Sequence, residues 1–189
     1  MKIVTDSGTN VYLSEEQCRE LGVKVVPLSV TLDGKTYREG LDVSSDEFYR
    51  MLEASGSLPT TSQPAAGEFA QLYREIAKTD PEILSIHMSS GLSGTLASAI
   101  AGAAMVPEAK ITIIDTKTLG APAGWQVEAA ARAVKAGWPL KRVIAYIEKI
   151  AAATDVVYTI KELKYLIHGG RISHIQGLVA SLLNLKPLI

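Results

Sequence analysis

The sequence is poor in cysteine, in clustered basic residues and in long apolar runs. Cys18 is the only cysteine, so no disulfide can form within the chain and no cysteine-based metal site can be built. No Lys/Arg run exceeds two residues and the formal net charge is -1, which argues against a nucleic-acid-binding face and against a polybasic membrane tether. Apolar runs are too short for a membrane span, and Asp6 interrupts the N-terminus before a signal-peptide core could form. We therefore expect a cytoplasmic protein with no nucleic-acid partner and no stable membrane insertion.

The usual fingerprints of nucleotide, metal and hydrolase sites are also missing. The sequence contains neither G-x-x-x-x-G-K-[ST] nor G-x-G-x-x-G, and no His/Cys/Asp/Glu spacing supports a metal. A serine-hydrolase elbow would need glycine where Thr95 stands, and the esterase-like His168–Arg171 stretch follows the candidate serine instead of preceding it. His87 is interpreted as a satisfied core residue inside a strand, whereas His168 and His174 flank a glycine pair and are expected to be exposed. We expect no cofactor, no metal and no catalytic residue.

Apolar residues make up 47% of the chain, enough for a sizeable core, and their pattern alternates between strands and helices. Strands are predicted over Lys2–Thr5, Val23–Leu32, Glu82–Met88, Lys110–Asp115 and Asp155–Ile160. Helices are predicted between Ser14 and Gly22, between Ser44 and Ser55, and over Ala65–Lys78, Ser93–Met105, Pro122–Ala136, Leu140–Ala153, Lys161–Ile167 and Ile172–Leu183. This alternation predicts an α/β fold with a mainly parallel sheet and helices on both faces.

Local signals mark several element ends. Ser14–Gln17 has the pattern of a capping box, and Gly22 is expected to end that helix. Asp33 and Gly34 predict a hairpin turn. The Gly56–Pro64 stretch shows no periodicity and is predicted to be a loop, with Pro64 in the first turn of the next helix.

A domain boundary is predicted near Thr154. Residues 1–153 are expected to form one α/β domain, and residues 154–189 the incomplete start of a second α/β domain. The helix predicted over Ile172–Leu183 has an apolar face that needs a partner. The chain stops on the apolar run Asn184–Ile189, and we expect it to be part of something longer.

The strongest local signal for a binding site is a strand followed by Ser89–Thr95 and then a helix. Ligands of open parallel sheets collect beyond the carboxyl ends of the strands, and a helix start offers unpaired N–H groups to an anion. Ser93 and Thr95 add hydroxyls, and Gly94 lets a ligand approach the backbone. In the alternative interpretation Ser93 only caps the helix and the glycines only serve the turn. A second hydroxyl cluster, Thr60–Pro64, precedes the next helix, and taken alone it favours an ordinary Ser/Thr turn with a proline start.

Taken together, these pieces resemble the DegV family, the fatty-acid-binding proteins of bacteria. The matching segments occur in the family's order and cover nearly the whole chain: Ile3–Ser7, Thr60–Pro64, Ser89–Thr95, Ile114–Thr116, Leu163–Ile172 and Leu185–Leu188. The resemblance implies two α/β domains with an acyl chain buried between them. Family members continue past Ile189, so the resemblance also implies that this chain is truncated at its C-terminus.

The resemblance further implies a non-catalytic role. The hydroxyls of Thr61 and Ser93 match the positions that hold the carboxylate of a long-chain fatty acid such as palmitate. Ser62, Gly94 and Thr95 belong to the same segments, and Arg171 matches a position near the head group. Some members are the lipid-presenting subunit of a fatty acid kinase, in which an ATP-dependent partner phosphorylates the bound acid. The rival hypothesis is an enzyme, a phosphotransferase or hydrolase that binds phosphate with Ser89–Thr95, because a helix start accepts phosphate as readily as carboxylate.

Overall fold

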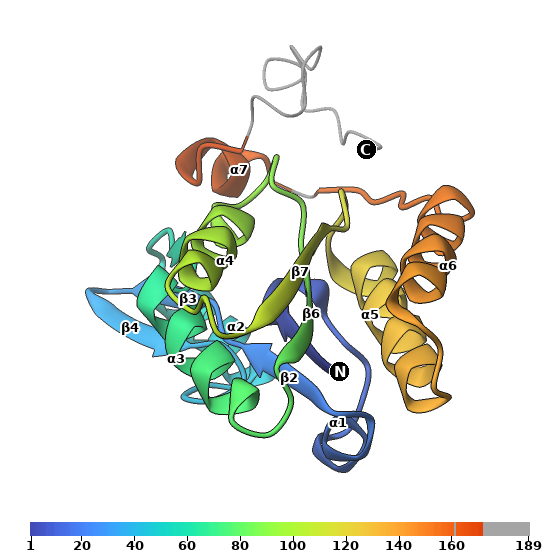
Figure 1. The fold of residues 1–189 in the computed structure, drawn as a ribbon. Coiled ribbons are helices and arrows are strands. Elements are labelled where there is room, and N and C mark those ends of the chain that lie inside the picture. Colours follow the sequence, from blue (N-terminus) through green and yellow to red (C-terminus); the bar gives the residue numbers. More distant parts are fainter. Residues whose placement is uncertain (161, 172–189) are drawn as a thin grey trace. The chain divides into compact units, whose positions relative to one another are not determined.

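The structure is a computed structural model that describes residues 1–160 and 162–171 (Figure 1). These residues divide into two units. The first comprises Met1–Leu28 and Gln63–Asp155, and the second comprises Ser29–Ser62 and the residues from Val156 onward. The helix predicted over Ile172–Leu183 with its apolar face, His174 and the tail Asn184–Ile189 lie outside the described residues. The domain boundary near Thr154 stays a prediction, which we retain as a proposal.

The first unit is built on a parallel sheet whose strand order is β2-β1-β6-β7. Its strands are β1 (Lys2–Asp6), β2 (Val23–Val26), β6 (Glu82–His87) and β7 (Lys110–Asp115), and all three neighbouring pairs are parallel. Strands β1 and β6 are central and almost wholly buried, as a parallel sheet covered on both faces requires. The predicted parallel α/β architecture is confirmed.

Helices cover both faces of this sheet because successive side chains of β1 point in opposite directions. Ile3 packs with apolar residues of α5 and α6, whereas its neighbour Val4 packs with those of α3 and α4. In Figure 1, α5 and α6 lie on one side of β6 and β7, and α3 and α4 lie on the other. The helices of the unit are α1 (Glu15–Leu21), α3 (Ala66–Ala77), α4 (Thr95–Ala104), α5 (Gly120–Lys135) and α6 (Leu140–Ala152), with a 3-10 turn at Ser7–Thr9.

The predicted start of α1 is confirmed, whereas α3 begins one residue later than predicted. Ser14 and Gln17 form the reciprocal capping box, and Gly22 ends α1 in the left-handed conformation with φ 68°. Pro64, however, lies before the cap of α3 and not in its first turn. The N-cap residue of α3 is Ala65, whose backbone is extended and whose N–H donates to the Glu68 carboxylate at 2.7 Å.

The strand predicted over Val23–Leu32 is two strands that belong to different units. Strand β2 ends at Val26, and β3 (Ser29–Leu32) begins a separate antiparallel sheet. Pro27 separates them because it has no N–H to donate to a strand ladder. The next N–H, that of Leu28, donates to Ser7 Oγ at 2.9 Å and not to a neighbouring strand.

The second unit contains an antiparallel sheet of order β4-β3-β5. Strand β3 pairs with β4 (Lys35–Arg38) through the predicted hairpin, where Asp33 and Gly34 both have positive φ, 50° and 75°. Positive φ at both central residues is the signature of a type I′ turn, whose twist matches that of the strands. The described residues of this unit form two helices, α2 (Ser45–Ser55), capped by Ser44 as predicted, and the short α7 (Lys164–His168).

Two further predictions about strands were wrong. Thr60–Ser62 is not loop but strand β5, which pairs with β3 so that Thr61 lies opposite Val30. All three of its side chains are exposed, so the strand is held by backbone pairing and leaves no hydropathy signal. Conversely, Asp155–Ile160 forms no strand. Its valines Val156 and Val157 are 41% and 66% exposed, so the apolar side chains that suggested a strand bury little surface.

The packing of α4 against α3 gives a prediction about Gly102. A Cβ at this position would lie 2.6 Å from the Cβ of Phe69 and 2.7 Å from the carbonyl oxygen of Ala66. Gly102→Ala should therefore lower the free energy of unfolding by about 1–3 kcal/mol, despite the better helix propensity of alanine. Denaturant-induced unfolding followed by circular dichroism measures the change.

Gly67 in α3 provides the matched control, because a Cβ there would meet nothing within 4 Å. Gly67→Ala should raise the free energy of unfolding by up to about 1 kcal/mol. Equal effects of the two substitutions would contradict the close approach of α3 and α4.

Candidate functional site

Polar residues gather at the carboxyl edge of the parallel sheet. Strands β1, β6 and β7 end at Asp6, His87 and Asp115, and each is followed by a segment rich in hydroxyls. Because parallel strands end at the same edge, these segments converge there, and this is the edge at which open α/β sheets bind ligands. The candidate site of the first unit is therefore the Ser89–Thr95 segment, which leads from β6 to α4.

The geometry of this segment allows the Ser93 hydroxyl to donate a hydrogen bond to a ligand. Ser93 Oγ accepts the N–H of Thr95 at 3.2 Å and lies 2.8 Å from Thr95 Oγ1. Thr95 is fully buried and Ser93 only partly so. When the Thr95 hydroxyl donates to Ser93, both acceptor positions of Ser93 are filled and its own O–H can donate to an anion. The capping residue of α4 is Gly94, so the interpretation of Ser93 as the helix cap is wrong.

Backbone and side-chain bonds hold the segment in place. Ser90 Oγ donates to Asp115 Oδ2 at 2.6 Å, and the N–H of Ser89 donates to the carbonyl of Thr118 at 2.8 Å. The N–H of Ser93 donates to the carbonyl of Ser89 at 3.2 Å. The end of β7 thus fixes the first half of the segment, and a turn within the segment fixes the second half.

A chain of four buried polar side chains lies beneath the segment, on the face of the sheet that α3 covers. Tyr73 Oη lies 2.8 Å from Ser85 Oγ, Ser85 Oγ lies 2.7 Å from His87 Nε2, and His87 Nδ1 lies 2.8 Å from Asp6 Oδ2. All four residues are fully buried. The second carboxylate oxygen, Asp6 Oδ1, is buried with no hydrogen-bond partner among the described residues. The prediction that His87 is a satisfied core residue is confirmed.

Three of these side chains, Ser85, His87 and Asp6, are hydrogen-bonded in the order of a Ser-His-Asp triad, but they do not have its chemistry. Ser85 is wholly buried and shares its hydroxyl with Tyr73, so it has no route to a substrate. Both ring nitrogens of His87 are bonded, to Asp6 and Ser85, so the imidazole is not placed to activate Ser93. The arrangement is therefore compatible with anion binding and offers no nucleophile–base pair.

The sequence analysis did not predict that these four side chains are hydrogen-bonded in series, although the alternation of side chains along a strand was visible. Ser85 and His87 stand two residues apart in a strand expected to be buried, so they share one face. The missing fact was the register, in which Val4 lies opposite Ser85. Two residues further along each strand, Asp6 comes beside His87. No motif links residues 81 positions apart.

The remaining predicted site residues belong to the second unit. Thr61 and Ser62 lie on β5, are exposed, and stand opposite Val30 and Ser29 of β3. Arg171 follows α7, where its N–H donates to the carbonyl of Leu166 at 3.0 Å and its guanidinium donates to the carbonyl of Gly169. Ser93, Gly94 and Thr95 lie in the first unit. His168, the last residue of α7, is exposed as predicted.

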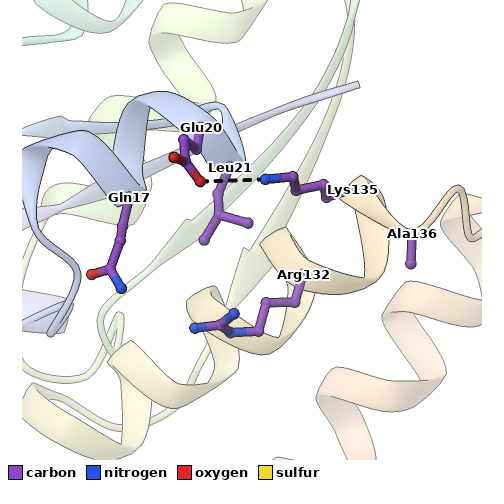
Figure 2. Close-up of a pocket in the computed structure, with 6 residues that line it drawn as sticks. All are labelled: Gln17, Glu20, Leu21, Arg132, Lys135 and Ala136. Carbon is purple, nitrogen blue, oxygen red and sulfur yellow. Dashed lines mark hydrogen bonds and ion pairs between the residues drawn. The ribbon is translucent and has the colours of Figure 1, made fainter.

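Two surface pockets of the first unit lie at the opposite edge of the sheet. One of about 360 Å³ lies between the C-terminal ends of α1 and α5, where Glu20 and Lys135 form an ion pair of 3.5 Å (Figure 2). Another, of about 540 Å³, is lined by Lys2 and Val23 at the starts of β1 and β2. Because helices return antiparallel to the strands, both pockets face the amino ends, which open α/β sheets do not use for ligands.

The described residues contain neither a metal-binding cluster nor a membrane-spanning helix. No group of three or more His, Cys, Asp or Glu residues is arranged to hold a metal ion. No helix is both long enough and apolar enough to cross a bilayer.

The fold and the candidate site define a parallel α/β domain with a hydroxyl-rich segment at the carboxyl edge of its sheet. The chain belongs to the DegV family: a family model described as "Uncharacterised protein, DegV family" matches residues 1–189. A DegV domain-containing protein of Listeria innocua is 38% identical over 188 residues. The match covers 99% of this chain and 66% of that relative, so the chain spans about two thirds of its length.

Solved structures of the family have the same fold. A DegV family protein from Thermus thermophilus, described by its fatty acid binding, is 35% identical with a TM-score of 0.87. A stearic acid-binding protein from Eubacterium ventriosum is 28% identical with a TM-score of 0.88. The matches cover 99% and 100% of this chain, and 66% of each of those chains. The family resemblance inferred from the motifs is confirmed.

The burial of Tyr73 predicts the pH range in which its hydroxyl ionises. Burial raises its pKa to about 12, and the hydrogen bond with Ser85 opposes part of that rise. The phenolate absorbance of wild type and Tyr73→Phe should therefore coincide up to about pH 11, since exposed tyrosines ionise near pH 10. At higher pH, or in denaturant, wild type should show the amplitude of the additional tyrosine.

The raised pKa of Tyr73 also makes the free energy of unfolding depend on pH, because proton release is linked to unfolding. Unfolded Tyr73 releases its proton at lower pH than folded Tyr73, so this residue makes the folded state less stable as the pH rises above about 10. A difference of about half a tyrosine between the two proteins at pH 10 under native conditions would show that the hydroxyl is not buried, since an exposed tyrosine is about half ionised at that pH.

Proposed function

We propose that this protein binds a long-chain fatty acid, and that the Ser93 hydroxyl, the start of α4 and the Thr61 hydroxyl hold its carboxylate. The observation that carries the proposal is the bonding of Ser93 to Thr95, because the Ser93 O–H can donate at a helix start when Thr95 is the donor of the bond between the two hydroxyls. Ser62, Gly94 and Thr95 complete the two segments. The fatty-acid binding described for the structural neighbours supports a carboxylate as the anion.

The proposed role is binding without chemistry. Hydroxyls and backbone N–H groups stabilise a carboxylate without attacking it, and His87 is occupied by Asp6 and Ser85. Affinity would come chiefly from the acyl chain, whose burial contributes about 0.8 kcal/mol per CH₂. Membranes and micelles offer the same burial, so the head-group contacts decide whether the acid leaves them for the protein. Solvent extraction and mass spectrometry of the purified protein separates the candidates: long-chain acids support this proposal, and phosphorylated metabolites support a phosphate-binding enzyme.

Ser93→Ala and Thr61→Ala should each weaken the binding of palmitate. Loss of one hydrogen bond to a charged group costs about 1.5–3 kcal/mol, which corresponds to roughly a ten- to hundredfold rise in Kd. Fluorescence competition with a labelled fatty acid measures the change, and thermal unfolding shows whether the fold is kept.

Ser57→Ala serves as a control for Thr61→Ala, because Ser57 is an exposed residue of the same unit that belongs to neither hydroxyl segment. Its Kd should equal that of wild type. Unchanged palmitate affinity in the Ser93→Ala/Thr61→Ala double variant would refute the head-group assignment.

We further propose that the bound acid is presented in the cytoplasm to an ATP-dependent fatty acid kinase, and that Arg171 serves the head group or this partner. A guanidinium suits both the carboxylate and the phosphate formed on it, since its planar fork can bind either with two parallel hydrogen bonds. The position of Arg171 directly after Gly169 and Gly170 supports the proposal, because Gly170 has φ 73°, a conformation that reverses the chain after α7.

Arg171→Ala should slow phosphorylation of bound palmitate by a cognate kinase by about tenfold or more, and Arg171→Lys should restore only part of the rate. The rate is followed as acyl phosphate formed from radiolabelled ATP. Wild-type rates in Arg171→Ala would show that this arginine serves only the local fold.

A further inference from the structure

We propose that the buried Asp6–His87 pair is a positioning device that fixes the Ser89–Thr95 segment and thereby the direction of the Ser93 hydroxyl. The inference rests on the proposed function, since it concerns the same head-group site. It assigns a role to two residues that are wholly buried and that form part of the sheet. All groups involved lie in the first unit.

The Asp6 carboxylate joins the end of β1 to the exit of β6. A single oxygen, Asp6 Oδ2, accepts both His87 Nδ1 at 2.8 Å and the backbone N–H of Met88 at 3.1 Å. Met88 is the last residue before the Ser89–Thr95 segment. The carboxylate therefore sets the orientation of the peptide from which the segment departs.

From Met88 the bonds continue to the candidate site. The carbonyl of Ser89 accepts the N–H of Ser93 at 3.2 Å, and Ser93 Oγ accepts the N–H of Thr95 at 3.2 Å. A short succession of bonds thus leads from the buried carboxylate to the hydroxyl proposed to bind the head group. Gly8 leaves room for this packing, because a Cβ there would lie 2.5 Å from Met88 Sδ and 3.1 Å from Asp6 Oδ1.

The proton arrangement fixes the imidazole ring. A neutral His87 satisfies the whole chain in one direction: Tyr73 donates to Ser85, Ser85 donates to Nε2, and Nδ1–H donates to Asp6. The ring also meets the edge of Phe69, with centroids 5.2 Å apart and planes at 85°. Bonds at both nitrogens and this aromatic contact hold the Nδ1–H toward the carboxylate.

Stability alone is a poor reason for such a pair. A buried carboxylate is costly to desolvate, and here one of its oxygens, Asp6 Oδ1, accepts no hydrogen bond from the described residues. Apolar side chains of similar volume at the two positions would fill the space at lower cost, as Val4 and Ile83 do on the same face. What apolar side chains cannot supply is an acceptor that holds the Met88 N–H and His87 in one geometry.

Two substitutions of His87 separate the bond to Asp6 from the bond to Ser85. Asparagine places its amide N–H near the position of Nδ1 and keeps a donor for Asp6. Glutamine is longer, places its amide near Nε2 beside Ser85, and leaves Asp6 without its side-chain donor. The binding of palmitate and of hexadecanol is measured for wild type and both variants, with circular dichroism to confirm folding.

If the Asp6–His87 pair positions the Ser93 hydroxyl, loss of the pair should weaken the binding of palmitate more than that of hexadecanol. His87→Gln should raise the Kd for palmitate by about tenfold and leave the Kd for hexadecanol within about twofold, because only the charged head group needs the aligned donor. His87→Asn should stay within about threefold of wild type for both ligands. A merely structural role would instead lower stability in both variants and leave the ratio of the two affinities unchanged, which would overturn the inference.

A double-mutant cycle tests the route through Ser93. When Ser93 is already alanine, His87→Gln should cause no more than about a twofold further loss of palmitate affinity, because the donor that it would misalign is absent. Additive losses would mean that His87 acts elsewhere and would overturn the inference. Failure of the proposed function is recognised separately: in that case Ser93→Ala binds palmitate as wild type does.

If His87→Gln does not fold, the combined substitution Asp6→Val with His87→Leu takes its place. It removes the pair without leaving a buried charge, so it should fold and bind hexadecanol yet lose about tenfold in palmitate affinity. Palmitate selectivity equal to that of wild type in this variant would overturn the inference.

Discussion

The hydrogen bond between Asp6 and His87 joins the two central strands at the edge where the chain leaves the sheet. Parallel pairing of β1 with β6 brings these side chains to the same face, and α3 covers them with Phe69 and Tyr73. The same carboxylate holds the N–H of Met88, from which the hydroxyl segment departs. The candidate head-group site is therefore built outward from the core of the sheet, and its geometry depends on a contact that water does not reach.

This construction explains how flexible residue types can form a defined site. Serine, glycine and threonine lose much conformational freedom when they are fixed, and a solvent-exposed loop of such residues would sample many geometries. Here Asp6 holds the start of the segment, Asp115 and Thr118 hold its first half, and Thr95 is buried at its end. The helix start and the Ser93 hydroxyl are thereby held in one geometry, which would lower the entropic cost of the proposed binding.

The elements that the sequence predicted well are those with local causes. The capping box at Ser14, the cap at Ser44 and the hairpin at Asp33-Gly34 each depend on a few adjacent residues, and all are present. The errors involve partners distant in the chain. Strand β5 exists because β3 lies beside it, and Asp155–Ile160 fails to form a strand although its valines favour one. The break within the strand predicted over Val23–Leu32 does have a local signal, because Pro27 has no N–H to donate to a strand ladder.

By itself the sequence determined the fold class, the family and the hydroxyl segments at the ends of β6 and before α3, because periodicity, capping and motif order are written along the chain. Tertiary structure alone decided that Ser93 leaves the capping of α4 to Gly94 and that Asp6, His87, Ser85 and Tyr73 form one buried chain. The physical reason is register. Side chains 81 positions apart meet only when two parallel strands align with Val4 opposite Ser85, and no local pattern specifies that alignment.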